Sequence, residues 1–247
     1  MDRLVYTSLS ALRGAMARQA STANNLANAN TVGFRAEMSS AQALWVRGDG
    51  FAARAPSSQE VTAADMRAGS VTETGRDLDI AMQGDALLAV QAQDGSEAYT
   101  RRGDLQVAAS GLLTTGDGRP VLGDGGPITL PPADSVRIGD DGVIWIVPAG
   151  GDPNVPQQVD RLKLASPTGS RVLKGVDGLF RVEDGGILPS DPSARLTPHS
   201  LESSNVQMSQ ALIDMIDASR AWDTQLNLIT TARDMDTSAA DLMRLPS

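Results

Sequence analysis

Glycine and proline are distributed so unevenly along this 247-residue chain that they divide it into three parts. Residues 1–32 contain a single glycine, Gly14, and no proline, and residues 200–245 contain neither type. All other glycines, and all but one of the prolines, lie between Gly33 and Pro198. Because both residue types weaken helix interiors and favour turns, this distribution predicts a helix at each end and a turn-rich middle.

Both terminal segments carry apolar side chains at alternating spacings of four and three residues, which is typical of a coiled-coil seam. At the N-terminal end the seam positions are Val5, Leu9, Leu12, Met16, Gln19, Ala23 and Leu26. At the C-terminal end they are Met208, Leu212, Met215, Ser219, Trp222, Leu226 and Ile229, with Ile213 and Ile216 widening the stripe. We expect the second helix to run from Asn205 to Met243 after an N-cap at Ser203 or Ser204.

Short apolar runs separated by turn signals predict that the middle is built of strands. These runs are Leu78–Met82, Ala86–Val90, Val143–Val147, Leu162–Ala165 and Leu179–Val182. Asp-Gly pairs, which favour tight hairpins, recur from Asp49 to Asp184. The predicted fold class is α+β: long N- and C-terminal helices that pair as a coiled coil, with a Gly/Pro-rich all-β middle domain. We divide the chain into a helix and loop (1–34), a linker with extended segments (35–75), a β-rich domain (76–199) and a second helix (200–247).

Composition excludes several classes of function. A formal net charge of −9 argues against nucleic-acid binding, which needs a basic face. The absence of cysteine excludes disulfides, thiol nucleophiles and thiolate metal sites. His199 is the only histidine, no G-x-S-x-G motif surrounds a serine, and the Asp-Gly pairs lack the spacing of a calcium loop. We therefore expect no catalytic residue, no metal and no cofactor.

The sequence also argues against membrane insertion. The N-terminus lacks the apolar core of a cleavable secretory signal, and no apolar stretch approaches the roughly 20 residues of a bilayer span. The two ends differ in charge: residues 1–36 carry four arginines against one aspartate, and residues 200–247 carry three arginines against seven acids. An acidic C-terminal helix would be repelled by an anionic lipid surface, so helix–helix packing is the better interpretation. The charge difference predicts that the two helices prefer each other, with Arg13 and Arg18 near C-terminal aspartates.

Three separated groups of motifs resemble the axial family of the bacterial flagellum, which includes its rod and hook proteins. Residues 24–34 read NNLANANTVGF, residues 201–206 read LESSNV, and between them lie LDIAMQG (78–84), YTRRG (99–103) and GLLT (111–114). The chain start, the RLKL at 161–164 and the KGVDGLFR at 174–181 are most similar to proximal rod members. A departure is Asp85-Ala86-Leu87-Leu88, where rod and hook relatives often carry Gly-Phe-Phe.

The resemblance implies a structural subunit of the proximal rod, the drive shaft that transmits torque. Such subunits form a helical tube with both terminal helices innermost and the β-rich domain facing outward. The implied partners are copies of the chain, neighbouring proximal and distal rod subunits, and the flagellar type III export apparatus. Export without a cleaved signal would bring the chain to the basal body, in the rod that spans the periplasm. The resemblance implies no nucleic-acid partner, no small-molecule substrate and no direct membrane insertion.

We expect the assembly interface to comprise the seam and motif positions. These are Val5, Leu9, Leu12, Met16, Asn24, Asn25, Leu26, Asn28, Gly33, Phe34, Asn205, Val206, Leu212, Met215, Ile216, Trp222, Leu226 and Ile229. Two alternatives remain open at this point. One is a non-enzymatic export or capping chaperone of axial proteins, which would form finite complexes through the same seams. The other is a β-rich enzyme with helical flanks, which would require His199 or an aspartate of the middle domain for activity with assembly intact.

Overall fold

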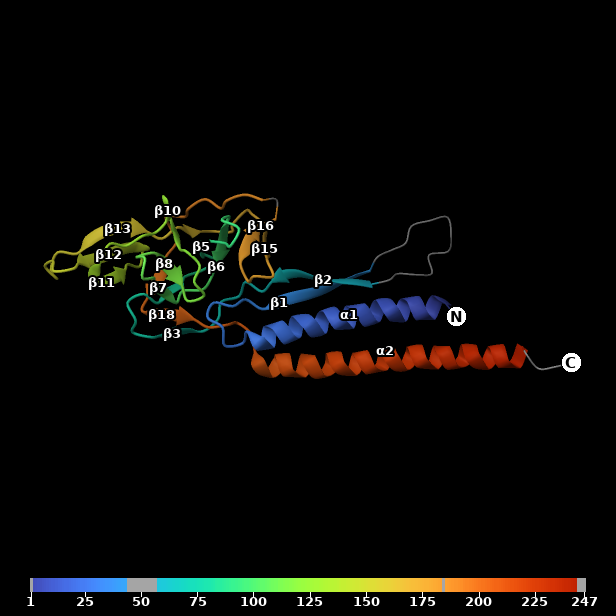
Figure 1. Ribbon diagram of the computed structural model, residues 1–247. Coiled ribbons are helices and arrows are strands. Elements are labelled where there is room, and N and C mark those ends of the chain that lie inside the picture. Colours follow the sequence, from blue (N-terminus) through green and yellow to red (C-terminus); the bar gives the residue numbers. More distant parts are fainter. Residues whose placement is uncertain (1, 44–56, 184, 244–247) are drawn as a thin grey trace. The chain divides into compact units, whose positions relative to one another are not determined.

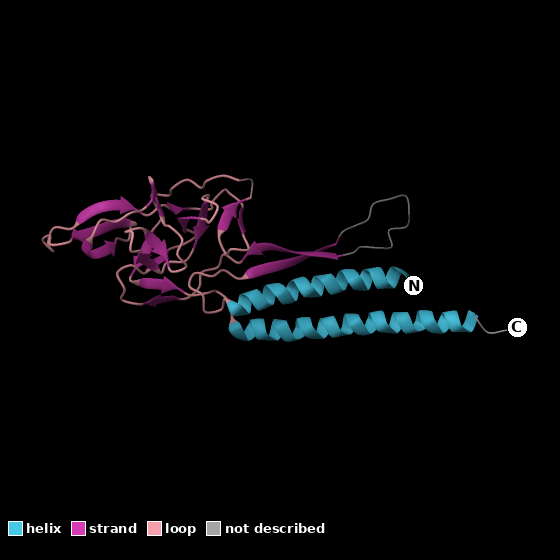
Figure 2. Cartoon of the chain, viewed as in Figure 1, coloured by secondary structure: helices cyan, strands magenta, loops and turns pink. Residues whose placement is uncertain are grey.

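The computed structural model describes residues 2–43, 57–183 and 185–243, with side chains described at 8–38, 63–183 and 185–240. It confirms the α+β class, with one helix near each end and strands between them (Figure 1; Figure 2). The chain divides into two compact units. The helical unit comprises Met1–Ala27, Glu37–Ala63 and Gln207–Ser247, and the β unit comprises Asn28–Ala36 and Ala64–Val206.

The helical unit contains α1 (Asp2–Ala27) and α2 (Met208–Met243), which run side by side in opposite directions (Figure 1). At a rise of 1.5 Å per residue they are about 39 Å and about 54 Å long. Strands β1 (Glu37–Ala43) and β2 (Ser57–Ala64) pair with each other in the same unit. The near-absence of glycine and proline explains why both helices continue without interruption.

Helix α2 begins at Met208, three residues after the predicted start at Asn205. The predicted cap at Ser203 or Ser204 is wrong, because the Ser204 hydroxyl instead accepts a hydrogen bond from the Val206 amide (3.2 Å) outside the helix. The first helical hydrogen bond runs from the Ala211 amide to the Gln207 carbonyl (2.9 Å). The Ser204 and Asn205 side chains cannot cap α2 because both make hydrogen bonds outside the helix.

The largest sheet of the β unit has five antiparallel strands in the order β14-β5-β6-β16-β15. Their bounds are β5 (Leu87–Gln91), β6 (Glu97–Thr100), β14 (Leu164–Ala165), β15 (Val172–Lys174) and β16 (Phe180–Val182). Strands β5 and β6 form a hairpin through Asp94-Gly95, where Gly95 has a φ of 82°. This is the left-handed backbone that an Asp-Gly turn supplies.

Smaller sheets complete this unit. A three-stranded sheet has the order β11-β12-β13, and β7 pairs with β8 and β9 with β10. Their bounds are β7 (Leu105–Val107), β8 (Leu113–Thr115), β9 (Leu122–Gly123), β10 (Gly126–Pro127), β11 (Ala133–Ile138), β12 (Val143–Pro148) and β13 (Gln157–Arg161). All five apolar runs that the sequence singles out contain part of a strand.

Two further pairs join the beginning of the β unit to its end. Strand β4 (Ile80–Met82) pairs with β17 (Leu196–Pro198), and β3 (Val71–Glu73) pairs with β18 (Ser200–Glu202). In the second pair Glu202 lies opposite Val71. These long-range pairings bring the C-terminal motif next to the first strands of the unit, which no local sequence signal indicates.

The core of the β unit is aliphatic, as the small number of aromatic residues predicts. One cluster contains fully buried side chains such as Ile80, Leu88 and Ile144, and a second cluster surrounds Tyr99 and Phe180. Tyr99 donates a hydrogen bond to Glu97 (2.7 Å), and burial raises the pKa of its phenol above the ordinary range.

Residues 35–75, which the sequence analysis treats as a linker with extended segments, contain three strands. Strands β1 and β2 belong to the helical unit, and β3 belongs to the β unit. Few large apolar residues occupy these strands, so their pairing leaves little periodic signal in the sequence. Residues 44–56 between β1 and β2 lie outside the described part of the chain.

Candidate assembly interface

Small side chains occupy the buried side of both terminal helices. The buried positions of α1 include Ser8, Gly14, Ala15 and Ser21, and those of α2 are Ala211, Ala218 and Ala232. Small residues allow two helix backbones to approach each other closely. In the described parts of both helices the fully buried positions therefore carry Ala, Ser or Gly, whereas the large residues of the predicted seam are at most partly buried.

On α2 most of the partly and fully buried positions alternate by four and three residues. These are Ala211, Met215, Ala218, Trp222, Gln225, Ile229 and Ala232, and Ala221 and Ala239 are also partly buried. Met215, Trp222 and Ile229 belong to the predicted seam. Leu212 and Leu226, also predicted, each lie one residue after a less exposed position, the buried Ala211 and the partly buried Gln225. On α1 Leu12 and Leu26 are partly buried. The side chain of Val5 lies outside the described side chains.

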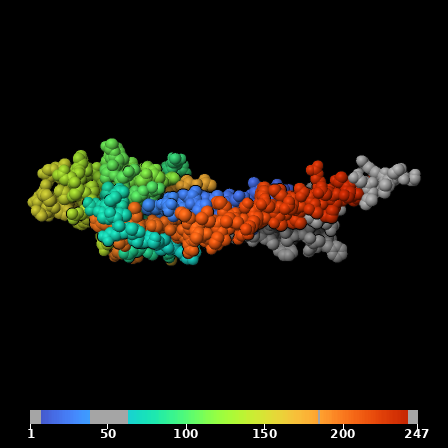
Figure 3. Space-filling model, turned by 90° about the horizontal axis from the view of Figure 1, so that it is seen from below, coloured from blue at the N-terminus to red at the C-terminus, as the bar shows by residue number. Residues whose placement is uncertain are grey.

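Among the described side chains, the other large apolar residues of these helices are exposed. On α2, Leu212 is 46% exposed, Ile213 52% and Ile216 53%. Ile216 lies four residues after Leu212 and three after Ile213, so it is a surface neighbour of both. On α1, Leu9 and Met16 are likewise exposed, one heptad apart. Figure 3 views the molecule from below and shows α2 facing the reader along its length, with α1 beside it.

Charged side chains of both signs flank these helices. A groove of about 450 Å³ within the helical unit is lined by residues that include Arg18 of α1 and Asp214 and Asp217 of α2. No ion pair within 4.0 Å joins Arg13 or Arg18 to an acid of α2 among the described side chains. Arg18 therefore shares a groove with two of the predicted partners but forms no direct bridge to them.

The asparagines of the NNLANANTVGF motif hold the end of α1. The Asn25 amide group pairs with both backbone groups of Glu37, accepting from its N–H (2.7 Å) and donating to its carbonyl (3.0 Å). Asn24 donates to the Glu37 carboxylate (2.6 Å). Asn28 accepts from the Thr31 amide (3.1 Å) and hydroxyl (3.1 Å), which closes the turn after the helix. An asparagine amide imitates a peptide group, which is why this residue type suits a helix end followed by a strand.

Gly33 and Phe34 continue this motif inside the β unit. Gly33 has a φ of 67°, its amide donates to the Glu202 carbonyl (2.8 Å), and an added Cβ would clash with the carbonyl of Arg101. Lys174 lies over the Phe34 ring, with Nζ 3.6 Å from the ring centre. The position of Gly33 therefore requires both a positive φ and the absence of a side chain.

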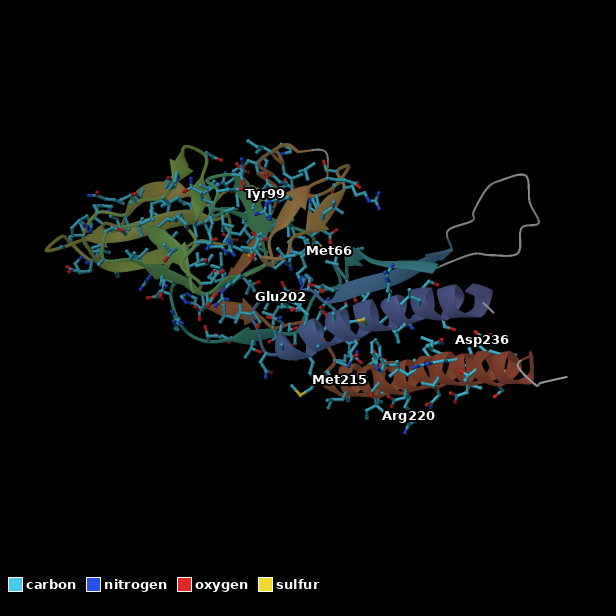
Figure 4. The ribbon with its side chains drawn as sticks, turned by 45° about the vertical axis from the view of Figure 1, so that its right-hand side comes forward. Met66, Tyr99, Glu202, Met215, Arg220 and Asp236 are labelled. Atoms are coloured by element: carbon cyan, nitrogen blue, oxygen red, sulfur yellow. The ribbon has the colours of Figure 1, made fainter. Side chains whose placement is uncertain are left out.

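A buried cluster of three charged side chains lies at the centre of these motifs. Arg35 and Glu202 are each 1% exposed and Arg101 is 2% exposed. Figure 4 labels Glu202. Glu202 Oε1 accepts from Arg35 Nη2 (2.7 Å) and from the Gly69 amide (2.8 Å). Glu202 Oε2 accepts from Arg101 Nε (2.9 Å) and Nη2 (2.6 Å). Charges are almost never buried unless they are paired in this way.

Arg101 extends the cluster to a fourth segment. Its guanidinium also donates to the carbonyls of Gly84 (2.7 Å), Ala86 (2.7 Å) and Met82 (2.9 Å). Burial lowers the pKa of Arg101 below its ordinary value, and the charge of Glu202 opposes that shift. Nε and Nη1 of Arg35 have no hydrogen-bond partner among the described residues, so Arg35 depends on Glu202 for its counter-charge. The Glu202 carboxylate of LESSNV therefore binds Arg101 of YTRRG and Arg35, which directly follows NNLANANTVGF, and Arg101 links it to carbonyls of LDIAMQG.

Asn205 ties together three more backbone segments. Its Oδ1 accepts from the Ala36 amide (2.7 Å), and its Nδ2 donates to the carbonyls of Asp65 (2.8 Å) and Arg67 (2.9 Å). Its own amide donates to the Phe34 carbonyl (3.3 Å). Val206, the next residue, is partly buried. These contacts explain why Asn205 stays outside α2.

Arg35, Arg101 and Glu202 are not among the site residues expected from the sequence. From the sequence, Arg35 and Glu202 count only as charges of the two terminal segments, whereas the structure pairs them with each other inside the β unit. Arg101 and Glu202 already stood in the middle and C-terminal motifs. The sequence signal that could have identified Arg101 and Glu202 is their place inside the YTRRG and LESSNV motifs, because a charged residue inside a motif often forms an ion pair.

The described residues show no arrangement typical of a catalytic or metal site. They contain no group of three or more His, Asp or Glu side chains placed to hold a metal ion. His199 Nδ1 lies 3.5 Å from an Asp77 carboxylate oxygen, and both side chains are about half exposed. No helix in the described ranges is long and apolar enough to cross a bilayer.

Comparison with known families gives three matches in chain order. Residues 5–35 match the family described as "Flagella basal body rod protein", residues 81–146 match "Flagellar hook protein FlgE/F/G D1 domain", and residues 197–242 match "Flagellar basal body rod FlgEFG protein C-terminal". The first and third matches include the motifs that meet at Glu202 and Asn205.

Individual relatives match over nearly the whole chain. The flagellar basal-body rod protein FlgF of Salmonella typhimurium is 41% identical over 251 residues, covering 99% of this chain and 100% of the relative. FlgF of Escherichia coli is 39% identical with the same coverage of both chains. The flagellar basal-body rod protein FlgG of Bacillus subtilis is 30% identical over 267 residues, covering 99% of this chain and 100% of the relative.

Proposed function

Because this chain belongs to the flagellar basal-body rod protein family, we propose that it polymerises with other axial proteins into the shaft that transmits torque. The chain is a structural subunit of the basal-body rod and is most like the proximal rod proteins. It belongs to a family of structural proteins and is not an enzyme. Its partners in this role are other rod and axial subunits.

The exposed apolar face of α2 is the observation that carries the polymerisation proposal. Leu212, Ile213 and Ile216 each expose about half of their surface although α1 already lies beside α2. Covering such a face gains roughly 25 cal/mol for each Å² of apolar surface removed from water. Neighbouring subunits are the partners that would cover it in a polymer.

We assign different parts of the predicted interface to different contacts. Leu9, Met16, Leu212, Ile216 and Leu226 point away from the contact within the chain and face neighbouring subunits. Met215, Trp222 and Ile229 serve the pairing of α2 with α1. The alternation of four and three residues among the buried positions of α2 supports a coiled-coil geometry for that pair.

Opposite charges on the two helices would favour contact between unlike helices of neighbouring subunits. Arg13 and Arg18 are exposed on α1, and Asp214, Asp217 and Asp223 are exposed on α2. A contact between the α1 face of one copy and the α2 face of another is heterologous, and a heterologous contact that does not close produces a filament. Each exposed ion pair contributes only about 0.2–1 kcal/mol, so the charges act on register and partner choice.

Family membership establishes part of the cellular location of the chain. The chain is a component of the flagellar basal body. We further propose that it leaves the cytoplasm through the flagellar type III export apparatus without a cleaved signal and reaches the rod in the periplasm. In this arrangement residues 1–34 and 200–247 are the axial segments, 76–199 the outer domain and 35–75 the connection between them. Nucleic acid, small molecules and direct membrane insertion have no place in this function.

Deletion of the gene and electron microscopy of isolated basal bodies test the function. We expect rods that stop short of the distal part, no hook and no swimming, all restored by the wild-type gene. Mass spectrometry of purified basal bodies separates the alternatives, because a rod subunit remains in the structure whereas an export or capping chaperone does not. Complete basal bodies in the deletion strain would contradict the proposal.

A further inference from the structure

The three-stranded sheet β11-β12-β13 of the β unit has a core face and an outer face (Figure 1). On the core face of the central strand β12, Ile144 is fully buried and Ile146 is 2% exposed. Successive side chains of a strand point to opposite faces of its sheet. Val143, Trp145 and Val147 of β12 therefore belong to the outer face.

Trp145 stands out on this outer face because it is a large apolar residue that is 38% exposed. It is the one aromatic residue that is exposed among the described side chains. In antiparallel sheets with one face toward water, the positions on that face usually carry polar residues. Tryptophan and arginine are enriched among the residues that supply most of the binding energy of protein interfaces. An exposed tryptophan on a central strand therefore indicates a contact with another protein chain.

Two arginines lie beside Trp145 on the outer face. The strand register places Arg137 of β11 directly opposite Trp145, and Arg161 of β13 opposite Val143. Residues that are directly opposite in an antiparallel pair lie on the same face of the sheet. Arg137 is exposed and forms no ion pair or hydrogen bond with another described residue. Arg161 Nη2 lies 3.7 Å from a carboxylate oxygen of Asp141, and both side chains are more than one third exposed.

The basic character of this face contrasts with the charge of the unit that carries it. Residues 28–36 and 64–206, which form the β unit, contain 13 lysines and arginines against 20 aspartates and glutamates. Other cations of the unit are already paired, as Arg102 is with Asp104 and Arg181 with Asp177. Two copies of an acidic unit repel each other unless a basic face lies in their contact, because complementary charges select the partner. This charge difference favours a second copy as the occupant of the outer face.

We propose that the outer face of β11-β12-β13 docks on an acidic surface of the β unit of a second copy of this chain. The inference rests on the proposed function as a rod subunit, and it adds a contact between β units to the contacts of the terminal helices. Trp145 supplies the apolar area of the contact, and Arg137 and Arg161 set its orientation. A basic face that meets an acidic surface is a heterologous contact, which is the kind that continues from copy to copy in a polymer.

Reversing the charge of Arg137 tests the contact without touching the core. The variant is Arg137→Glu, and its control is Arg171→Glu, at an arginine whose side chain is 71% exposed. We expect both purified monomers to unfold at the same urea concentration as the wild type, because both positions are exposed. Quantitative mass spectrometry of basal bodies should find roughly tenfold less of the Arg137 variant than of the control, since like charges placed opposite each other weaken association by at least that factor. Equal amounts of the two variants would overturn the proposal.

Trp145→Ser should lower the amount of the chain in basal bodies in the same way. About two thirds of this side chain is covered by its own unit, so the variant is informative only if its monomer still folds. If it does not fold, Arg137→Glu decides alone.

Photo-crosslinking in basal bodies identifies the occupant. Gln158 is exposed and lies opposite Trp145 on β13, so it is replaced by benzoylphenylalanine, with the same probe at the fully exposed Val176 as control. We expect the Gln158 probe to give a crosslinked dimer of this chain whose second peptide comes from the β unit, and the control probe to give none. A crosslink to a different protein would overturn the choice of a second copy, and no crosslink would overturn the docking face. Failure of the proposed function is distinguishable, because basal bodies would then lack the wild-type chain itself.

Discussion

The helical unit and the β unit bury opposite kinds of side chain. In the β unit the large aliphatic residues are inside, with Ile80, Leu88 and Ile144 fully buried. In the helical unit the buried side chains are small, and Leu212 and Ile216 remain half exposed. The β unit therefore buries its large apolar residues within one chain, whereas the helical unit leaves part of its apolar surface exposed. This difference is what we expect of a subunit whose helices, as proposed above, are covered by neighbouring subunits.

Introducing a charge on the exposed face of α2 should have the largest effect. Leu212→Asp would place an unpaired carboxylate in a packed contact between subunits, costing several kcal/mol per subunit. We expect swimming to be lost and rods to be absent while the secreted monomer keeps its β-sheet circular dichroism. Val176→Asp makes a comparable change at a fully exposed residue of the β unit and should swim normally. Wild-type swimming by the Leu212 variant would contradict the comparison.

Limited trypsin digestion of the monomer compares the two units in one experiment. Helices that lack their neighbours open with a free energy near zero, whereas a packed core opens only with global unfolding. We expect early cuts after Arg13, Arg18, Arg220 and Arg233, and slow cuts after the buried Arg35 and Arg101. The measurement is the mass of the surviving fragments over time. Terminal helices that resist as long as the β unit would show that the single chain stabilises them fully.

A large-to-small substitution should harm the β unit and spare the helical unit. Leu88→Ala removes a fully buried side chain and is expected to lower the free energy of unfolding of the monomer by about 2–5 kcal/mol. The same change at Leu212, which is half exposed, should alter monomer stability by no more than about 0.5 kcal/mol. Urea unfolding followed by circular dichroism gives both values. Similar losses in the free energy of unfolding for Leu88→Ala and Leu212→Ala would show that the two units do not differ in this respect.

A small-to-large substitution should show the reverse preference. Ala218→Leu would push α1 and α2 apart where they meet through small residues, costing about 1–3 kcal/mol by overpacking. We expect weaker helical circular dichroism at elevated temperature and fewer assembled rods, with the β unit unaffected. Ala240→Leu, at an exposed position of α2, is the control. A variant that is as helical and as motile as the wild type would show that the helices do not pack as closely as the buried alanines indicate.

Relief of backbone strain should give the smallest effect, confined to the β unit. Among the described residues His199 is the one non-glycine residue with a positive φ, at 55°. His199→Gly should stabilise the fold by about 1 kcal/mol and raise its melting temperature by about 2–4 °C. His199→Ala removes the imidazole but keeps the strained backbone, so it should give no gain. A loss of motility in His199→Ala with normal rods would instead return the possibility of an enzyme.

The distribution of glycine and proline sufficed to predict which parts of the chain are helical and which are built of strands, since both effects are local. The motifs likewise sufficed for the family. Local rules failed where a side chain forms hydrogen bonds with residues far away in the sequence. Ser204 and Asn205 were predicted to begin a helix, but the side-chain amide of Asn205 forms hydrogen bonds with the backbone of Ala36, Asp65 and Arg67 in the β unit.

The sequence by itself determined two amphipathic terminal helices, an aliphatic β middle and the absence of residue sets for familiar chemistry, because composition and spacing act within a few residues. Only the tertiary structure decided which positions of each helix are buried. A seam that alternates by four and three residues can move by one position when small side chains let the backbones approach, as Ala211 and Leu212 show. Only the tertiary structure, too, could reveal the burial of Glu202, because its partners Arg35 and Arg101 lie more than a hundred residues away along the chain.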